Sequence, residues 1–322
     1  MANGYVTHSD LVYFAETKVN LHRNDAKEYR EQVGRLRENI GSFIDTHPNH
    51  GLVKMLLSGS LAKGTALKTL NDIDVALYVE SKIAPSRIDD LVDWLAQRLR
   101  EAYPNIAPDK ISPGRHCVRI SFSGSGLDVD VVPVYYEGAP DDRGYLYARD
   151  SGNRVLTSIP LHLRFIRCRK SLKPIHFAQI IRLIKWWGRS QKQLDSNFRF
   201  KSFMAEMITA ELLDQGTEFS DYPNAMESVF KYIVRSQLKK RISFSDYYSI
   251  SQIRNSIVDP IQIFDPVNPD NNIAQDYDDT VRIRIVQCAE RSLEKLAEAR
   301  YATTRERAVD CWKAVLGPSF GV

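Results

Sequence analysis

The chain has 322 residues, enough for one large domain or two closely packed ones with a substantial core. Apolar residues make up 43% and charged residues 26%, and no apolar run approaches the roughly 18 residues of a membrane span, so we expect a globular protein with no membrane contact. The formal net charge of +4 is compatible with polyanionic ligands but does not by itself indicate them.

The first predicted elements are helices, within residues 8–47. A long helix over residues 24–47 has apolar side chains three or four residues apart, which is typical of a helix packed on a core. Its other face is basic, with Lys27, Arg30, Arg35 and Arg37. Such a face is usually solvated, and contact with nucleic acid or an activator is the alternative.

Residues 55–79 carry the most informative pattern. An apolar run ends in Ser58-Gly59-Ser60, and after a polar connector Asp72 and Asp74 alternate with apolar residues. Alternate side chains of a strand point the same way, so both carboxylates share one face. Two such carboxylates repel each other, and a divalent cation such as Mg²⁺ would relieve the repulsion. The glycine turn is not followed by Lys-Ser or Lys-Thr, so we exclude a P-loop NTPase.

A second acidic strand is predicted at residues 127–135, after a Gly-Ser turn at residues 123–126. It carries Asp128 and Asp130 on one face, and spacing leaves both open as a third carboxylate. If this strand lies beside the first acidic strand, the carboxylates meet and could hold two Mg²⁺ ions, or Mn²⁺ in their place, for phosphoryl transfer. The alternative is that each acidic strand is only a solvated face.

The predicted secondary structure changes about halfway along the chain, from strands and helices to helices alone. A helix pattern over 85–103 and a strand pattern over 117–122 predict a mixed sheet with helices packed on it, and an irregular segment follows at 138–153. Helices are then predicted at residues 160–172, 175–190, 201–214, 222–236, 276–300 and 304–316. We therefore expect an α/β lobe at 1–158 that includes the long helix, a helical lobe at 159–322, and a central cleft.

The Gly59-Ser60 turn and the two acidic strands together resemble the pattern of the polymerase-β-like nucleotidyltransferases. This resemblance implies that Asp72, Asp74 and Asp130 are catalytic and bind metal, and that Gly59 and Ser60 bind the phosphates of a nucleotide. It favours Asp130 over Asp128 because Asp130 is followed by a Val-hydrophobic-Pro run, as in the family member that the chain most resembles.

Three later segments are similar to the oligoadenylate-synthetase-like branch of that superfamily: RLIKWW at 182–187, KSFMAE at 201–206 and IFDPVNPDNN at 263–272. Over roughly residues 20–300 the chain resembles the bacterial cGAS/DncV-like nucleotidyltransferases, of the clade C or D type. The resemblance implies that Lys185 binds the donor triphosphate, Ser202 contacts the nucleotide, Phe203 stacks on a base and Arg182 braces phosphates. A core position is an equal alternative for Phe203.

The resemblance implies a nucleotidyltransferase that uses ATP, and other NTPs as an option, to make a cyclic oligonucleotide second messenger in bacterial antiphage (CBASS) signalling. We expect an adenine-rich product such as cyclic tri-AMP. The alternatives are a linear oligoadenylate synthetase, a tRNA CCA-adding-type enzyme, and an inactive nucleic-acid-binding module that keeps the fold. Metal-dependent turnover of ATP would separate the enzymes from the binding module.

Regulation and location are expected from the same resemblance and from composition. The resemblance implies a HORMA-domain activator protein and double-stranded DNA as candidate partners. The zinc insertion of animal cGAS is missing, so any activation must use another surface or a protein partner. The basic residues Lys27, Arg30 and Arg37 and those at 239–241 favour contact with DNA. The N-terminus has no signal-peptide pattern, and the four cysteines have no paired spacing, so we expect a reducing cytoplasm.

Overall fold

The computed structural model describes residues 5–47, 51–70, 72–122 and 127–321, and it forms two compact units. The first, here called the strand unit, is Leu21–Ile166. The second, the helical unit, combines Met1–Asn20 with Arg167–Val322. Within the described residues, no helix is both long and apolar enough to cross a membrane. The predicted turn at 123–126 lies outside the described residues.

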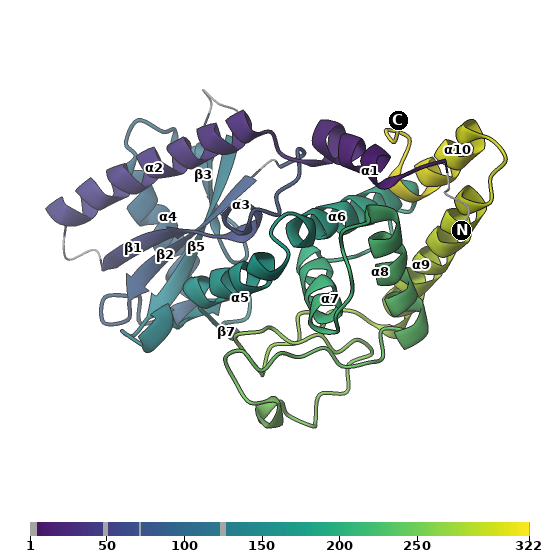
Figure 1. Ribbon diagram of the computed structural model, residues 1–322. Helices are drawn as coiled ribbons and strands as arrows, with labels where there is room; N and C mark the ends of the chain where they lie inside the picture. The colour runs from purple at the N-terminus through teal and green to yellow at the C-terminus, as the bar shows by residue number, and fades with distance from the viewer. Residues whose placement is uncertain (1–4, 48–50, 71, 123–126, 322) are drawn as a thin grey trace. The chain divides into compact units, whose positions relative to one another are not determined.

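The strand unit is built on one mixed sheet (Figure 1). Its strands follow the order β1-β2-β5-β4-β3, with β6 paired to β5 and β7. The pair β2–β5 is parallel, and the other pairs are antiparallel. The strand bounds are β1 Leu52–Leu57, β2 Asp72–Glu80, β3 Ile111–Pro113, β4 Val118–Phe122, β5 Leu127–Tyr136, β6 Gly144–Tyr147 and β7 Arg154–Thr157. The two strands predicted at 117–122 and 127–135 are therefore confirmed, as β4 and β5.

Helices α2, Arg23–Thr46, and α4, Leu91–Ala102, contribute most of the helical part of the main core of this unit. On β2, Ile73 and Val75 are fully buried in that core while the alternating acids stay partly exposed. Further along β2 the residues are buried on both faces, and Tyr78 packs in a second cluster. Because burial on both faces begins after the acids, the carboxylates remain accessible only at the start of the strand.

The predicted long helix is confirmed, whereas the helix expected over 85–103 begins later. A 3₁₀ turn at Ile88–Asp90 precedes α4, which starts at Leu91 and buries its apolar stripe in the core. The hydroxyl of Tyr103, just after α4, donates to the carbonyl of Leu36 on α2 at 2.9 Å. This bond ties the two helices together.

The helical unit contains the helices α1 His8–Phe14, α6 His176–Leu194, α7 Ser202–Asp214, α8 Tyr222–Ser236, α9 Asp279–Arg300 and α10 Arg305–Leu316. A π-helical turn, η1 Ala15–Val19, follows α1, and α5 Ile159–Leu172 runs across the boundary of the two units. Trp187 of α6 is fully buried at the centre, where its indole N–H donates to Ser292 of α9 at 2.9 Å. The predicted helices of this half are thus present, with ends that differ by a few residues.

Residues 5–20 pack with the helical unit, whereas we expected them to belong to the α/β lobe at 1–158. Leu11, Phe14 and Val19 are fully buried, and the Phe14 ring lies 5.8 Å from that of Trp186 and 4.9 Å from that of Phe320. Apolar side chains with the spacing of an ordinary amphipathic helix cannot indicate which core they enter. The division into lobes after residue 158 stays a prediction.

Candidate active site

The acidic residues of the two strands lie side by side. In the parallel pairing of β2 with β5, Asp72 is opposite Asp128 and Asp74 is opposite Asp130. Neighbouring strands are about 4.8 Å apart, and residues two apart share a face, so all four carboxylates occupy one patch of the sheet. The predicted meeting of Asp72, Asp74 and Asp130 is therefore found in the structure, while their chemical roles stay predictions.

A basic residue that we did not expect from the sequence lies among these acids. Arg119 of β4 is opposite Asp130 in the antiparallel pairing of β4 with β5. Its Nε and Nη2 donate to Asp130 Oδ1 and Oδ2, both at 2.8 Å, and Nη2 also donates to Asp72 Oδ2 at 3.3 Å. The hydrogen bonds that Arg119 donates to Asp130 raise the pKa of Arg119 above its already high ordinary value, so the guanidinium stays charged.

A signal for Arg119 was present in the sequence. In the segment VRISF, Arg119 alternates with the buried Val118 and Ile120, so its side chain points away from the core. The pairing partner was not readable, because it depends on the register between β4 and β5.

Gly59 lets the Gly-Ser turn approach the acids closely. The turn leads into α3, Gly59–Lys63, and Ser58 N donates to the backbone carbonyl of Asp74 at 2.9 Å. Gly59 has a φ of +63°, and a Cβ added there would lie 1.9 Å from Asp74 Oδ2. Only glycine combines that backbone conformation with that contact. The structure thus sets Gly59 against the carboxylate of Asp74, and Ser60 follows it in α3, while their binding of phosphates stays a prediction.

The donor chemistry of this patch fits Mg²⁺, which prefers oxygen ligands. Among the described residues, no three His, Cys, Asp or Glu side chains are grouped so as to hold an ion by themselves. Mg²⁺ sites in phosphoryl-transfer enzymes are typically completed by substrate phosphates and water, with one or two carboxylates from the protein. Asp72, Asp74 and Asp130 are therefore suitable ligands for an ion that arrives with a nucleotide.

The other predicted site residues lie together in the helical unit, on α6 and the start of α7. Ser202 is exposed and Phe203 is half-buried. Lys185 Nζ donates to Glu206 Oε1 at 2.8 Å, and the two side chains are only 4% and 3% exposed. Glu206 lies one helical turn after Phe203, so this buried ion pair joins the first turns of α7 to α6. The role of Lys185 as a triphosphate ligand stays a prediction.

Arg182 is held by a small amide network. Its Nη2 donates to Gln179 Oε1 at 2.7 Å, and the side-chain amides of Gln179 and Asn20 donate to each other at 2.9 and 3.0 Å. Burial lowers the pKa of Arg182 from its ordinary value. The π-helical turn η1 ends directly before Asn20, so the N-terminal segment helps to orient this arginine.

The segment at 263–272, which carried part of the resemblance, is a hydrogen-bonded loop with three buried polar side chains, Asp265, Asn268 and Asn272. Asn272 Oδ1 accepts from the backbone N–H groups of Ile263 and Ala274 at 3.0 and 3.1 Å. Lys201, immediately before α7, donates to the carbonyl of Ile273 at 2.9 Å. The segment therefore supports the start of α7, where Ser202 and Phe203 lie.

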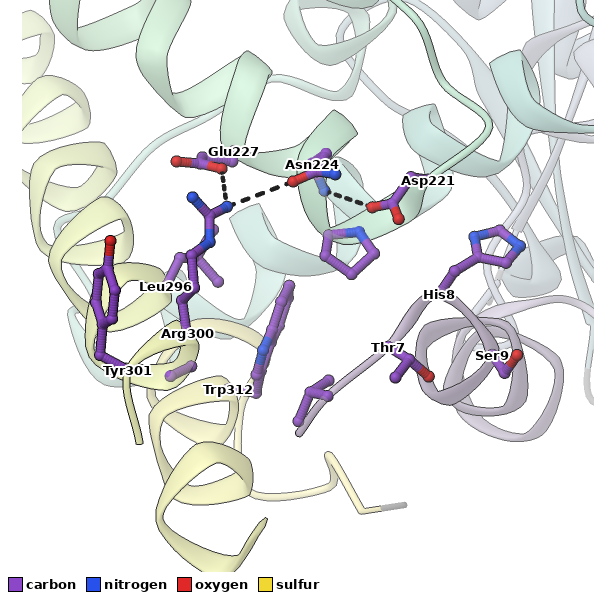
Figure 2. Close-up of a pocket in the computed structure, with 13 residues that line it drawn as sticks. Thr7, His8, Ser9, Asp221, Asn224, Glu227, Leu296, Arg300, Tyr301 and Trp312 are labelled. Atoms are coloured by element: carbon purple, nitrogen blue, oxygen red, sulfur yellow. Dashed lines mark hydrogen bonds and ion pairs between the residues drawn. The ribbon is translucent and has the colours of Figure 1, made fainter. Parts of the chain in front are cut away.

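The helical unit also contains a cavity of about 660 Å³, lined by residues of α1, α8, α9 and α10 (Figure 2). Figure 2 shows Arg300 directed at α8, where Nη2 donates to Glu227 Oε2 at 2.5 Å and to Asn224 Oδ1 at 3.4 Å. Asp221 accepts from the N–H of Asn224 at 2.9 Å. The lining includes none of the predicted site residues.

Comparison with known proteins identifies full-length relatives, although no protein-family model matches the chain. A cyclic AMP-AMP-AMP synthase of Escherichia coli (strain MS 115-1) is 48% identical over 320 residues, covering 99% of both chains. A CBASS oligonucleotide cyclase CdnC of E. coli (strain KTE188) is 29% identical over 322 residues, covering 98% of both.

Solved structures agree with this similarity. CdnC of E. coli MS115-1 has been solved with ATP and in a CdnC:HORMA-deltaN complex. Each structure matches with a TM-score of 0.93 and 47% identity over 99% of this chain. The match covers 100% of the CdnC chain in the structure with ATP and 99% of the chain in the HORMA complex. The predicted nucleotidyltransferase fold, a mixed sheet with helices and a C-terminal helical part, is thereby confirmed.

Proposed function

The chain belongs to the CdnC-type CBASS oligonucleotide cyclases, and from this membership we propose that it joins ATP into a cyclic AMP-AMP-AMP second messenger. The observation that carries the proposal is the register of β2 and β5, which sets Asp74 opposite Asp130 and Asp72 opposite Asp128 in a chain that is 48% identical to a synthase of this product. The family and the enzyme class expected from the sequence are confirmed.

In the proposed reaction, a ribose hydroxyl attacks the α-phosphorus of ATP, and the bond to pyrophosphate breaks. Asp72 and Asp74 would hold Mg²⁺, which when bound supplies positive charge to the attacking and leaving oxygens. Asp130, which lies beside Asp74, would orient the attacking hydroxyl and take its proton. Positioning and charge stabilisation account for most of the catalysis in such transfers.

Gly59 and Ser60 are proposed to hold the phosphates of the donor, since their turn lies against Asp74. In the helical unit, Arg182 and Lys185 would supply positive charge to phosphates, and Ser202 and Phe203 would contact the nucleoside. An ammonium has three donors, so the bond from Lys185 to Glu206 is compatible with a second acceptor. Stacking of a base on Phe203 would contribute about 1–3 kcal/mol.

We also propose a HORMA-domain protein as activator, because CdnC of E. coli MS115-1 has been solved in a complex with a HORMA protein. Double-stranded DNA stays a prediction, and its affinity should fall steeply with salt because phosphate contacts release counterions. A reducing cytoplasm is the proposed location, in keeping with four cysteines that form no disulfide.

The test is an incubation of the purified protein with radiolabelled ATP and Mg²⁺, alone, with the HORMA partner and with long duplex DNA. Phosphatase treatment and chromatography then identify the product. We expect a phosphatase-resistant adenine product that is lost in the Asp72→Asn/Asp74→Asn variant and in Asp130→Asn. Asp128→Asn is the matched control on the same strand face and should keep turnover.

A phosphatase-sensitive ladder would instead identify a linear oligoadenylate synthetase. A product that persists in the Asp72→Asn/Asp74→Asn variant would contradict the assigned carboxylates. Absence of any product with ATP, partner and DNA together would contradict the proposed function.

A further inference from the structure

Arg119 holds the carboxylate of Asp130 through the Nε–Nη2 edge of its guanidinium. The Nε–Oδ1 and Nη2–Oδ2 bonds are each 2.8 Å, which is the parallel two-bond arrangement that suits arginine and a carboxylate. A carboxylate held in this way cannot rotate about its last bond without losing both hydrogen bonds. The arrangement therefore fixes the direction in which the remaining lone pairs of Asp130 point.

The same guanidinium reaches the neighbouring acids. Arg119 Nη2 donates to Asp72 Oδ2 at 3.3 Å, and Nε lies 3.9 Å from Asp128 Oδ2. One positive charge thus bridges both acidic strands, β2 and β5. Without it, carboxylates on adjacent strands would repel one another and spread apart.

We propose that Arg119 is a positioning residue for nucleotidyl transfer. It holds Asp130 in the orientation that faces the attacking hydroxyl, and it keeps Asp72 close to Asp130 through the same guanidinium. The inference rests on the proposed function, since it requires Asp130 to take part in the transfer. A carboxylate has about four lone-pair sites, so the clamp leaves Asp130 able to accept a further donor or to bind metal.

Exposure separates this role from a purely structural one. The Arg119 side chain is 44% exposed and that of Asp130 is 13% exposed. Water screens the charge of an arginine that is this exposed, so its ion pair with Asp130 contributes only modestly to the stability of the fold. Loss of Arg119 should therefore leave the protein folded and change chiefly how the carboxylates are oriented and how strongly they attract cations.

Two substitutions separate the effect of the Arg119 charge from the effect of its two-bond geometry. Arg119→Gln removes both, whereas Arg119→Lys keeps a positive charge but lacks the planar fork. Arg149→Gln is the control, because Arg149 is as exposed as Arg119 and makes an ion pair with a carboxylate, Asp93 at 2.7 Å, elsewhere in the strand unit. Asp130→Asn completes the set by testing the carboxylate itself.

Two readouts are measured for each variant. The first is kcat and KM for ATP. The second is the affinity for Mn²⁺ in the absence of nucleotide, measured by calorimetry or electron paramagnetic resonance. We expect Arg119→Gln to lower kcat by about 100-fold through misplacement of Asp130, with KM little changed. The same variant should bind Mn²⁺ about tenfold more tightly, because a competing positive charge has gone. Arg119→Lys should lower kcat as well but keep the affinity for Mn²⁺ near that of the wild type.

The opposite directions of the two readouts are the signature of the clamp, since a merely structural pair would shift neither and Arg149→Gln should shift neither. Wild-type kcat in Arg119→Gln, with Asp130→Asn inactive, would overturn the inference and leave the proposed function intact. An active Asp130→Asn would overturn both. Equal effects of Arg119→Gln and Arg149→Gln would also overturn the inference.

Discussion

Replacing Gly59 by alanine is the sharpest test of how the Gly-Ser turn shapes the active site. Gly59 has a φ of +63°, and an added Cβ would meet Asp74 Oδ2 at 1.9 Å. Even a tight contact of 3.0 Å would need the carboxylate to retreat by about 1.1 Å. The substitution therefore strains the backbone and displaces a carboxylate of the proposed site.

The two effects have different magnitudes and different readouts. A left-handed conformation costs a residue with a Cβ roughly 1–2 kcal/mol, and this cost appears in the free energy of unfolding. A displacement of about 1 Å at a reacting group costs on the order of 100-fold in rate. Gly59→Ala should thus lose a modest part of its stability and most of its turnover.

Gly138→Ala is the matched control, because Gly138 has a φ of +80° and nothing within 4 Å of the added Cβ. It carries the backbone cost without the clash. Urea unfolding and turnover of radiolabelled ATP are measured for both variants. Gly138→Ala should be destabilised by about 1–2 kcal/mol with wild-type turnover. Wild-type turnover in Gly59→Ala would refute the reasoning, because Asp74 would then tolerate displacement.

Two further predictions concern buried groups. Glu206→Ala leaves the buried Lys185 ammonium without its carboxylate partner, so urea unfolding should show a loss of about 3–5 kcal/mol in the free energy of unfolding. The double variant Lys185→Met/Glu206→Leu removes both charges and should recover most of this loss. A double variant as unstable as Glu206→Ala would contradict this reasoning. Burial, and after it the charge of Asp130, raises the pKa of Cys117 to about 11. Because that folded pKa exceeds the unfolded value of about 8.5, the thiol contributes stability that is complete below that pH and is lost as the pH rises towards 11. Peptide-level mass spectrometry should find slow alkylation of Cys117 at pH 8 and faster alkylation in Asp130→Asn; a wild-type profile centred near 8.5 would contradict the shift.

Several features of the site could be predicted from local pattern. The alternation around Ile73 placed Asp72 and Asp74 on one face, because the side-chain period of a strand is two whatever its partner. The Gly-Ser turn at 58–60 could be recognised upstream of the acids, whereas the close approach of Gly59 to Asp74 is seen only in the structure. The role of Lys185 could be proposed only from resemblance, since no local pattern indicated its burial against Glu206.

The sequence by itself determined the faces of the strands, the long helix of the strand unit and the resemblance to nucleotidyltransferases. Only the tertiary structure decided that β2 and β5 are parallel neighbours with Asp74 opposite Asp130, and that Arg119 lies across from Asp130. It also decided that the N-terminal helix packs with the helical unit. The physical reason is that periodicity comes from bonds within a segment, whereas strand order and register come from hydrogen bonds and packing between segments far apart in the chain.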